Sequence, residues 1–223
     1  MIELWQRHDL LRVKSAAWLR ILQAQPRFPT LPHVARWAER RRPLIVRRRA
    51  PGDAPDQIPV ALPLPPACGK ARLAAQLFPD EIAERVPPLT LRELQPELPP
   101  VWQPLAAQLL DAAKQTGVES PRVFGSWLWQ RLTGLAYVTA RSDLDLLWPL
   151  RTADDANRLV GRLASIAAKS VLPFDGEILL PDGSGVHWRE WRTDAASEVL
   201  VKTMSGVQLR ARASLFPTEA EAA

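Results

Sequence analysis

The sequence contains a single cysteine, Cys68, so an internal disulfide and a cysteine-based zinc cluster are both excluded. It contains no run of about eighteen apolar residues, the length that a membrane-spanning helix needs. The first residues include Glu3, Arg7 and Asp9, which do not fit the apolar core of a secretory signal. We therefore expect a protein of the cytoplasm.

Glycine is also scarce, with 10 residues against 22 prolines. The pair Gly69-Lys70 is typical of the end of a phosphate-binding P-loop, but Leu64 stands where that motif requires its first glycine and Ala71 where it requires Ser or Thr. A P-loop is excluded, and Lys70 remains a candidate phosphate contact. The prolines between residues 79 and 100 disfavour long helices and strands, so we place a domain boundary there.

The charge of the chain is unevenly distributed. Its 223 residues carry a net charge of +5, but residues 1–50 hold twelve Lys and Arg against three Asp and Glu, which is +9 and leaves −4 for the rest. A basic front part indicates a polyanionic or acidic partner. The arginines from Arg41 to Arg49 form either an ordinary solvated face or a docking patch, and Arg47 is a candidate substrate contact within it.

In the first part of the chain, apolar residues at helical spacing predict a helix that begins after Asp9 and ends near residue 24, and a second helix over residues 31–42. Short apolar runs predict strands over residues 44–46 and 58–62. These elements predict a small basic α+β domain over residues 1–88.

From residue 101 onward, helical and strand patterns alternate. They predict helices over 101–116, from 127 to 132, from 152 to 169 and over 194–200, with strands over 122–124, 143–149, 174–180, 186–191 and 207–212. The pattern predicts an α/β (α+β) fold with a mixed sheet and flanking helices over residues 96–213. Residues 214–223 are predicted to be a disordered tail.

Asp143 and Asp145 lie two positions apart in a predicted strand, so both point to the same face, about 7 Å apart at their Cα atoms. Such carboxylates repel each other unless a cation lies between them, and Mg²⁺ prefers carboxylate and phosphate oxygens. We predict that this pair is catalytic and binds Mg²⁺. Glu177 on a later strand is the preferred third ligand of a two-metal site, and Asp175 is the alternative.

Gly125 and Ser126 lie between a predicted strand and a predicted helix. Glycine allows the backbone to approach a ligand, and a helix N-terminus offers free N–H groups to a phosphate. The Ser126 hydroxyl adds a further donor. Either feature alone is common by chance, but the turn and the paired carboxylates in this order predict a nucleotidyltransferase.

These motifs resemble the nucleotidyltransferase superfamily that includes DNA polymerase beta. More narrowly, nearly the whole chain resembles the phosphoribosyl-dephospho-coenzyme A transferases of bacterial malonate decarboxylase, which are holo-acyl-carrier-protein synthases. The matching pieces are Arg7-His8-Asp9-Leu10, Arg42-Pro43, residues 62–66 with Gly69-Lys70, Gly125-Ser126 with Trp129, Thr133-Gly134, Tyr137, residues 142–145, residues 175–177 and residues 188–190.

The resemblance implies that a serine of the apo acyl-carrier subunit attacks the α-phosphate of triphosphoribosyl-dephospho-coenzyme A and that pyrophosphate leaves. It implies that Asp143 and Asp145 are catalytic and that Gly125 and Ser126 hold the triphosphate. Other candidate substrate contacts are Lys70, Lys202, Arg47 and Trp188, the last on a predicted strand beside that of Glu177. The basic domain would recognise the carrier or the cofactor.

Three alternatives stay open. The acceptor could be a citrate lyase carrier protein, or the enzyme could act on a small molecule or RNA, although nucleic acid and membrane partners are not expected. The third alternative is a non-catalytic basic binding module. His187 alternates in direction with Trp188, so we do not assign it as a general base.

Overall fold

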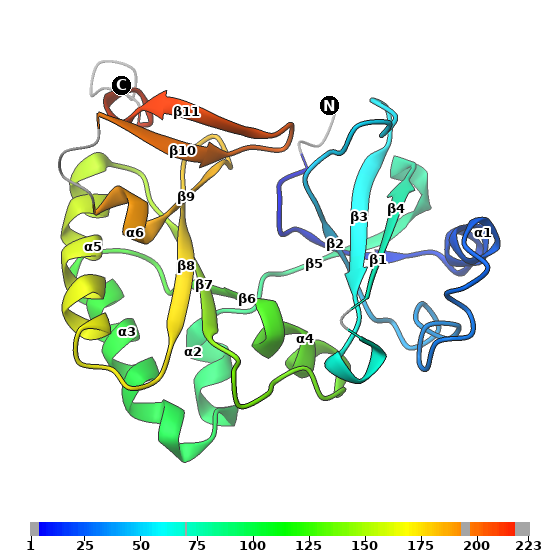
Figure 1. Cartoon of the computed structure of the whole chain (residues 1–223), viewed down its shortest axis with the longest axis horizontal. Helices are drawn as coiled ribbons and strands as arrows, with labels where there is room; N and C mark the ends of the chain where they lie inside the picture. The colour runs from blue at the N-terminus through cyan, green and yellow to red at the C-terminus, as the bar shows by residue number, and fades with distance from the viewer. Residues whose placement is uncertain (1–4, 70, 193–196, 217–223) are drawn as a thin grey trace. The chain divides into compact units, whose positions relative to one another are not determined.

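A computed structural model of the chain describes residues 5–69, 71–192 and 197–216. They form two compact units, each built around one sheet (Figure 1). The first unit runs to Pro88 and also includes Trp129–Thr139, and the second contains Leu89–Leu128 and the chain from Ala140 onward. The predicted α+β fold class is confirmed. Among the described residues, no helix has the length and apolar character needed to cross a membrane.

The sheet of the first unit has five antiparallel strands in the order β4-β3-β2-β1-β5. The strands are β1 (Leu10–Val13), β2 (Leu44–Val46), β3 (Ile58–Pro63), β4 (Arg72–Leu77) and β5 (Ile82–Val86), and short 3₁₀ turns occupy Pro66–Cys68 and Pro79–Glu81. In β2 the buried residues alternate with a less buried one, whereas β3 is buried at five consecutive positions, so both faces of β3 are covered. The strands predicted over 44–46 and 58–62 are confirmed.

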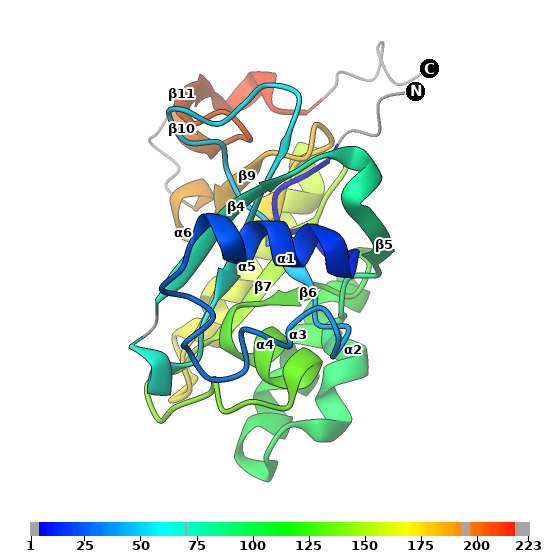
Figure 2. The ribbon, with the colours of Figure 1, turned by 90° about the vertical axis from the view of Figure 1, so that its right-hand side faces the viewer.

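Helix α1 (Ser15–Ala24) buries Trp18, Ile21 and Leu22, and Figure 2 shows it running across the first sheet. The indole N–H of Trp18 donates to the carbonyl of Val34 at 3.0 Å. This bond fixes the irregular segment that follows the helix.

Two helix predictions in this unit were wrong. The helix expected after Asp9 begins only at Ser15, because residues 10–13 form β1, which pairs with β2 and β5. Residues 31–42 form successive turns instead of a helix. His33 and Arg41 have φ angles of 70° and 52°, and these left-handed conformations cannot continue an α-helix.

The segment Trp129–Thr139 packs with the first unit although it lies forty residues beyond Pro88 in the sequence. The ring of Trp129 lies 6.3 Å from that of Trp37, and the Tyr137 hydroxyl donates to the carbonyl of Pro63 at 2.8 Å. Arg42, which is buried, donates to the carbonyl of Thr133 at 2.7 Å. The sequence patterns did not predict that residues 129–139 pack with the first unit.

The second unit has a six-stranded mixed sheet in the order β11-β10-β9-β8-β7-β6. The strands are β6 (Arg122–Phe124), β7 (Leu144–Pro149), β8 (Phe174–Leu179), β9 (Gly185–His187), β10 (Glu198–Lys202) and β11 (Val207–Ala211). Only β7 and β8 are parallel, and helix α5 (Ala153–Ala167) connects them. The other neighbours are antiparallel.

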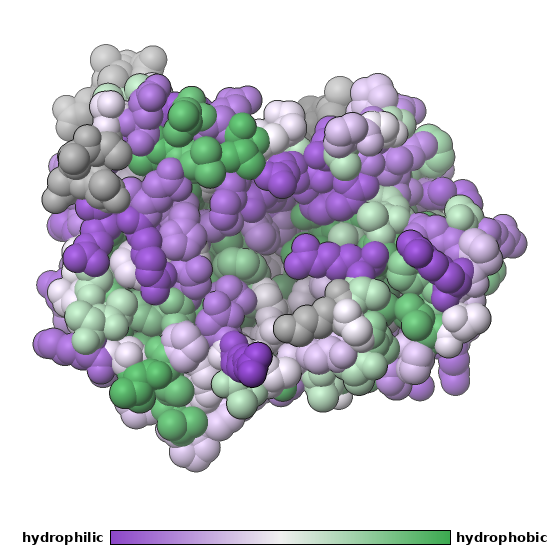
Figure 3. Space-filling model, viewed as in Figure 1, coloured by the Kyte–Doolittle hydropathy of each residue, from purple (hydrophilic) through white to green (hydrophobic). Residues whose placement is uncertain are grey.

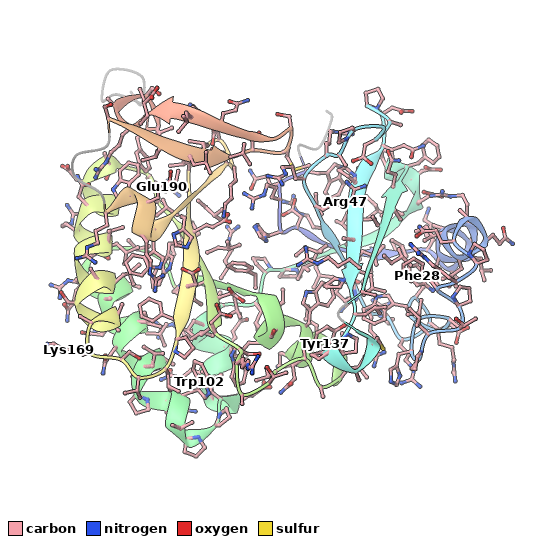
Figure 4. The ribbon with its side chains drawn as sticks, viewed as in Figure 1. Phe28, Arg47, Trp102, Tyr137, Lys169 and Glu190 are labelled. Atoms are coloured by element: carbon pink, nitrogen blue, oxygen red, sulfur yellow. The ribbon has the colours of Figure 1, made fainter. Side chains whose placement is uncertain are left out.

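Helices α3 (Gln103–Gln115) and α5 lie along one side of this sheet (Figure 1). They cover the face on which β7 buries Leu144, Leu146 and Trp148. The remaining helices are α2 (Leu91–Leu94), α4 (Gly125–Thr133) and α6 (Trp188–Trp191), and 3₁₀ turns occupy Gln95–Glu97, Pro100–Trp102 and Arg212–Ser214. Trp102, labelled in Figure 4, contacts the Trp127 ring edge-on at 5.3 Å.

Two predictions in the second unit need correction. The strand expected over 186–191 ends at His187, because residues 188–191 form α6, where the His187 side chain accepts the backbone N–H of Arg189. The helix expected over 194–200 is contradicted by β10, which begins at Glu198, and residues 193–196 lie outside the described residues.

The ordered chain continues into the segment that was expected to be a disordered tail. Leu215 and Phe216 are buried, and the Phe216 ring contacts Trp191 edge-on at 5.7 Å. Residues 217–223 lie outside the described residues.

Candidate active site

The predicted acidic residues lie on one face of the second sheet. Asp145 on β7 is directly opposite Asp175 on β8, and Glu177 follows two positions later on β8. Because side chains alternate along a strand, these three carboxylates point to the face opposite Leu144 and Leu146. We call this face, which α3 and α5 do not cover, the acid face.

Asp145 is the most perturbed of these carboxylates. Its partial burial raises its pKa to about 7, and the negative charges of Asp143, Asp175 and Glu177 contribute further. Each cause disfavours the ionised form. The shift indicates that Asp145 is poorly solvated and close to three other carboxylates, so a cation bound beside it would favour its ionised form.

Gly125 lies directly against Asp145. Strand β6 pairs with β7 so that Phe124 is opposite Asp145, and helix α4 begins at the next residue. A Cβ atom on Gly125 would lie 1.9 Å from Oδ2 of Asp145, and the φ angle of Gly125 is 67°. No other residue fits both the space and the conformation without strain. The structure therefore brings the predicted Gly-Ser turn and the aspartate strand together.

Asp175 already has two cationic or donor partners. Its Oδ1 lies 2.7 Å from Nη1 of Arg189 and 2.8 Å from Nε2 of His187. Nδ1 of His187 accepts the backbone N–H of Arg189 at 3.3 Å, so Nε2 carries the proton that is donated to Asp175. His187 thus fixes Asp175, and it is not placed as a general base.

Glu177 also has a cationic partner. It is only 6% exposed, and its Oε1 lies 2.6 Å from Nζ of Lys202 on β10. Lys202 is opposite Gly185 in the pairing of β10 with β9, and glycine has no side chain that could lie between Lys202 and Glu177. Lys202, a predicted substrate contact, therefore reaches the acid face.

Asp143 and Asp145 differ from these two acids. Within the described residues, no Lys, Arg or His forms an ion pair with either of them. No group of three His, Cys, Asp or Glu side chains in the described ranges is arranged to hold a metal ion as the side chains stand. The pair nevertheless has the donor chemistry of a site for a hard cation, because its atoms are carboxylate oxygens and its charge is uncompensated.

Other predicted contacts lie elsewhere. Trp188 is 1% exposed and stacks on Phe174 at 5.8 Å, so it is a core residue in this structure and does not line an open surface. Lys70 lies outside the described residues. Ser126 follows Gly125 in the first turn of α4, as predicted.

Arg47, labelled in Figure 4, is held within the first unit. Its guanidinium forms two bonds of 2.7 and 2.8 Å to Asp53 and donates to the carbonyls of Val60 and Arg48. Arg49 similarly donates to the carbonyls of Ala54 and Gln57. These arginines fasten the loop between β2 and β3, and Arg47 could bind substrate only after breaking its ion pair.

Sequence reasoning did not place Arg189 or Phe124 on this face, and it considered His187 only as a general base, a role that it did not assign. Arg189 could have been found, because the strand expected over residues 186–191, continued in the antiparallel register of β9 with β8, places Arg189 opposite Asp175. Phe124 could have been found, because alternation from the Gly-Ser turn places it beside the aspartate strand.

The comparisons of this chain with family models and with known proteins all identify the same family. Residues 6–88 match the family model described as "Phosphoribosyl-dephospho-CoA transferase MdcG N-terminal domain", and residues 90–213 match the corresponding C-terminal domain. The chain is 41% identical over 218 residues to a phosphoribosyl-dephospho-CoA transferase of Xanthomonas euvesicatoria, covering 97% of this chain and 99% of the relative. It is 39% identical over 203 residues to one of Bradyrhizobium diazoefficiens, covering 91% and 88%. No solved structure matches.

Proposed function

The chain belongs to the phosphoribosyl-dephospho-CoA transferase family, and on that premise we propose that it attaches this prosthetic group to the apo acyl-carrier subunit of malonate decarboxylase. The donor is triphosphoribosyl-dephospho-CoA. The oxygen of a carrier serine bonds to the α-phosphorus, the bond to the bridging oxygen breaks, and pyrophosphate leaves.

The observation that carries this proposal is the position of Asp145 against the Gly125 turn and close to the charge of Asp143, with no ion-pair partner for either acid among the described residues. Phosphoryl transfer requires little covalent chemistry from the protein, and catalysis depends on positioning and on charge. A carboxylate pair beside a helix N-terminus supplies both.

We propose that Asp143 and Asp145 hold Mg²⁺, with Glu177 or Asp175 as the third ligand of a two-metal site. Mg²⁺ at this position would neutralise charge on the attacked phosphate and activate the attacking hydroxyl. Because Asp175 is bonded to Arg189 and Glu177 to Lys202, either acid would have to rotate away from its partner or share an oxygen.

The other residues would bind and orient the donor. The Gly125 backbone lets the Asp145 carboxylate lie against the start of α4, and the first turn of α4 with the Ser126 hydroxyl would offer hydrogen-bond donors to a phosphate there. Lys202 would add positive charge near the leaving diphosphate. The first unit, whose sequence is strongly basic, would contribute to recognition of the carrier or the cofactor.

The proposal is tested by incubating the protein with Mg²⁺, triphosphoribosyl-dephospho-CoA and the apo carrier subunit of malonate decarboxylase. Mass spectrometry should show the mass of the prosthetic group added to the carrier serine, and pyrophosphate should appear in equal amount. The apo carrier of citrate lyase serves as the comparison acceptor. Equal rates with both carriers would remove the assignment to malonate decarboxylase, and no transfer to either would remove the proposed reaction.

A further inference from the structure

The two carboxylates that β8 presents on the acid face lie at different levels along the strand. Asp175 is directly opposite Asp145, whereas Glu177 is opposite Leu147, two residues further along β7. Two residues of a strand span about 7 Å. Mg²⁺ binds its ligand oxygens at about 2.1 Å in an octahedron, so neighbouring oxygens around one ion lie about 3 Å apart. Asp175 is therefore level with Asp145, and Glu177 lies a full step beyond it.

The charges around Asp145 follow the same order. After its partial burial, the largest contribution to the raised pKa of Asp145 comes from the negative charge of Asp143. The contribution of Asp175 comes next, and that of Glu177 is the smallest. Because the energy between two charges falls with the distance between them, this order indicates that Asp175 is nearer to Asp145 than Glu177 is.

Glu177 is bound by a cation of the protein itself. It is 6% exposed, and Nζ of Lys202 lies 2.6 Å from its Oε1. Separation of a buried carboxylate from its cationic partner leaves an uncompensated charge away from water, which is strongly unfavourable. We therefore expect the pair of Glu177 and Lys202 to persist when the acid face binds a ligand.

Asp175 is held in orientation but keeps an accessible carboxylate, which is 36% exposed. Nη1 of Arg189 lies 2.7 Å from Oδ1, and Nε2 of His187 lies 2.8 Å from Oδ1 and 3.0 Å from Oδ2. Figure 3 shows mainly hydrophilic side chains over α6 and the adjoining end of β9, from which these partners come. A carboxylate has about four acceptor positions, which two N–H donors do not fill. Asp175 thus retains room for a cation.

The two partners of Asp175 differ in charge. His187 accepts the backbone N–H of Arg189 on Nδ1 at 3.3 Å, so its ring is a neutral donor to Asp175 through Nε2. A neutral donor orients a carboxylate without cancelling its charge, as the partners of metal-binding carboxylates do. The Arg189 side chain is 48% exposed, so water weakens the effect of its charge.

Resting on the proposed function, we propose that His187 is a positioning residue, which holds Asp175 as the third carboxylate ligand of Mg²⁺. Within the described residues, no cationic side chain pairs with Asp143 or Asp145, so Asp175 is the member of the set whose orientation is fixed before the ion binds. The buried ion pair of Glu177 stays outside the metal site.

The test measures the Kd for Mn²⁺, which prefers the same oxygen ligands, by electron paramagnetic resonance on the full-length protein without donor or carrier. In His187→Asn, the shorter amide can still accept the Arg189 N–H at the start of α6 but does not extend to Asp175. We expect the Kd for Mn²⁺ to rise about tenfold or more. His187→Gln, whose amide nitrogen can take the position of Nε2, should raise it less than about threefold.

A double-mutant cycle separates positioning from a general structural effect. Asp175→Asn should itself raise the Kd for Mn²⁺ about tenfold or more, and His187→Asn should have no further effect in that background, because it acts only through Asp175. An equal loss from His187→Asn in both backgrounds would overturn the proposal. His33→Asn removes an exposed imidazole of the first unit at a φ angle of 70°, which asparagine tolerates, and should leave the Kd unchanged.

The double variant Glu177→Gln/Lys202→Met removes the buried pair without changing the net charge, and should change the Kd for Mn²⁺ less than about threefold. A loss as large as that of Asp175→Asn would assign the third ligand to Glu177 and overturn the proposal. These measurements contain neither substrate, so they fail separately from the proposed reaction. Transfer by the wild type, together with an unchanged Kd in His187→Asn, would keep the function and overturn the role of His187.

Discussion

The two sheets differ in how completely their carboxylates are paired with cationic side chains. In the first unit, cations and acids on neighbouring strands and loops are paired, as in Arg12–Glu84, Arg20–Glu81, Arg47–Asp53 and Arg85–Asp9. On the acid face of the second unit, carboxylates lie beside one another, and within the described residues Asp143 and Asp145 have no ion-pair partner. In the first unit each of these carboxylates has a cationic partner, whereas on the acid face Asp175 and Glu177 have one and, among the described residues, Asp143 and Asp145 have none. The comparison indicates that the basic composition of the front part is largely used internally.

The largest effect is expected at the aspartate pair. Asp143→Asn and Asp145→Asn should each reduce the transfer rate by about 10³-fold or more, because several kcal/mol of charge stabilisation in the transition state would be lost. Rates are measured as prosthetic group attached per minute by mass spectrometry. Asp53→Asn, which removes a carboxylate of the first unit, is the control and should retain transfer activity. Full activity in both Asp143→Asn and Asp145→Asn would contradict the catalytic assignment.

A smaller effect is expected at Gly125. Gly125→Ala would place a methyl group against Oδ2 of Asp145 and should reduce the transfer rate by about 10²-fold through displacement of that carboxylate. Gly134→Ala is a matched control, because its φ angle of 69° imposes the same backbone strain, but no atom lies within 4 Å of the added Cβ. Both should lose about 1 kcal/mol or more of stability. Equal losses of activity would show that backbone strain alone is responsible.

The pH dependence of stability provides a third comparison. The folded-state pKa of Asp145 is about 7, against an ordinary value of 3.8, so between these pH values the folded protein binds more protons than the unfolded chain. The free energy of unfolding contributed by this group is therefore highest below pH 4 and falls as the pH rises to about 7. In EDTA at pH 8, Asp145→Asn should be more stable than the wild type by about 2 kcal/mol.

Urea denaturation at pH 5 and pH 8 measures this difference, with and without Mg²⁺. Mg²⁺ should raise the stability of the wild type at pH 8 and should have little effect on Asp145→Asn. A wild type whose stability relative to Asp145→Asn is the same at both pH values would show that the pKa of Asp145 is not raised in the folded state.

The smallest effect is expected at Arg47. Arg47→Lys should lower the free energy of unfolding by about 1–2 kcal/mol, because lysine cannot reproduce the two parallel bonds to Asp53. The KM for the donor should change by less than about twofold. A clear increase in that KM, measured in a stabilised variant so that the loss of stability does not interfere, would show that Arg47 contacts the substrate.

The sequence was sufficient for much of the second unit. The strands over 122–124 and 174–180 and helix α5 were predicted correctly, because each carries a local signal: an apolar run, a turn, or the Thr152 cap. Alternation also placed Asp175 and Glu177 on one face of their strand, but the register that sets Asp175 and not Glu177 opposite Asp145 comes only from the structure.

The features that could not be predicted from the sequence depend on contacts between residues that are far apart in the chain. Strand β1 exists because β5 pairs with it some seventy residues later, and no local pattern reports that pairing. The ion pairs of Asp175 and Glu177 likewise depend on residues from α6 and β10. Trp188 was assigned to a pocket wall from its neighbours in sequence, but its stacking on Phe174 places it in the core.

The return of Trp129–Thr139 to the first unit has a consequence for how the protein is made. When residues 1–88 have left the ribosome, Trp37 and Arg42 still lack the ring of Trp129 and the carbonyl of Thr133. The first unit can complete its core only after about fifty further residues have been synthesised, among them the Gly125 turn. Despite the division into two family domains, the amino-terminal part is therefore not an independent early folding product, and synthesis of the two parts is interleaved.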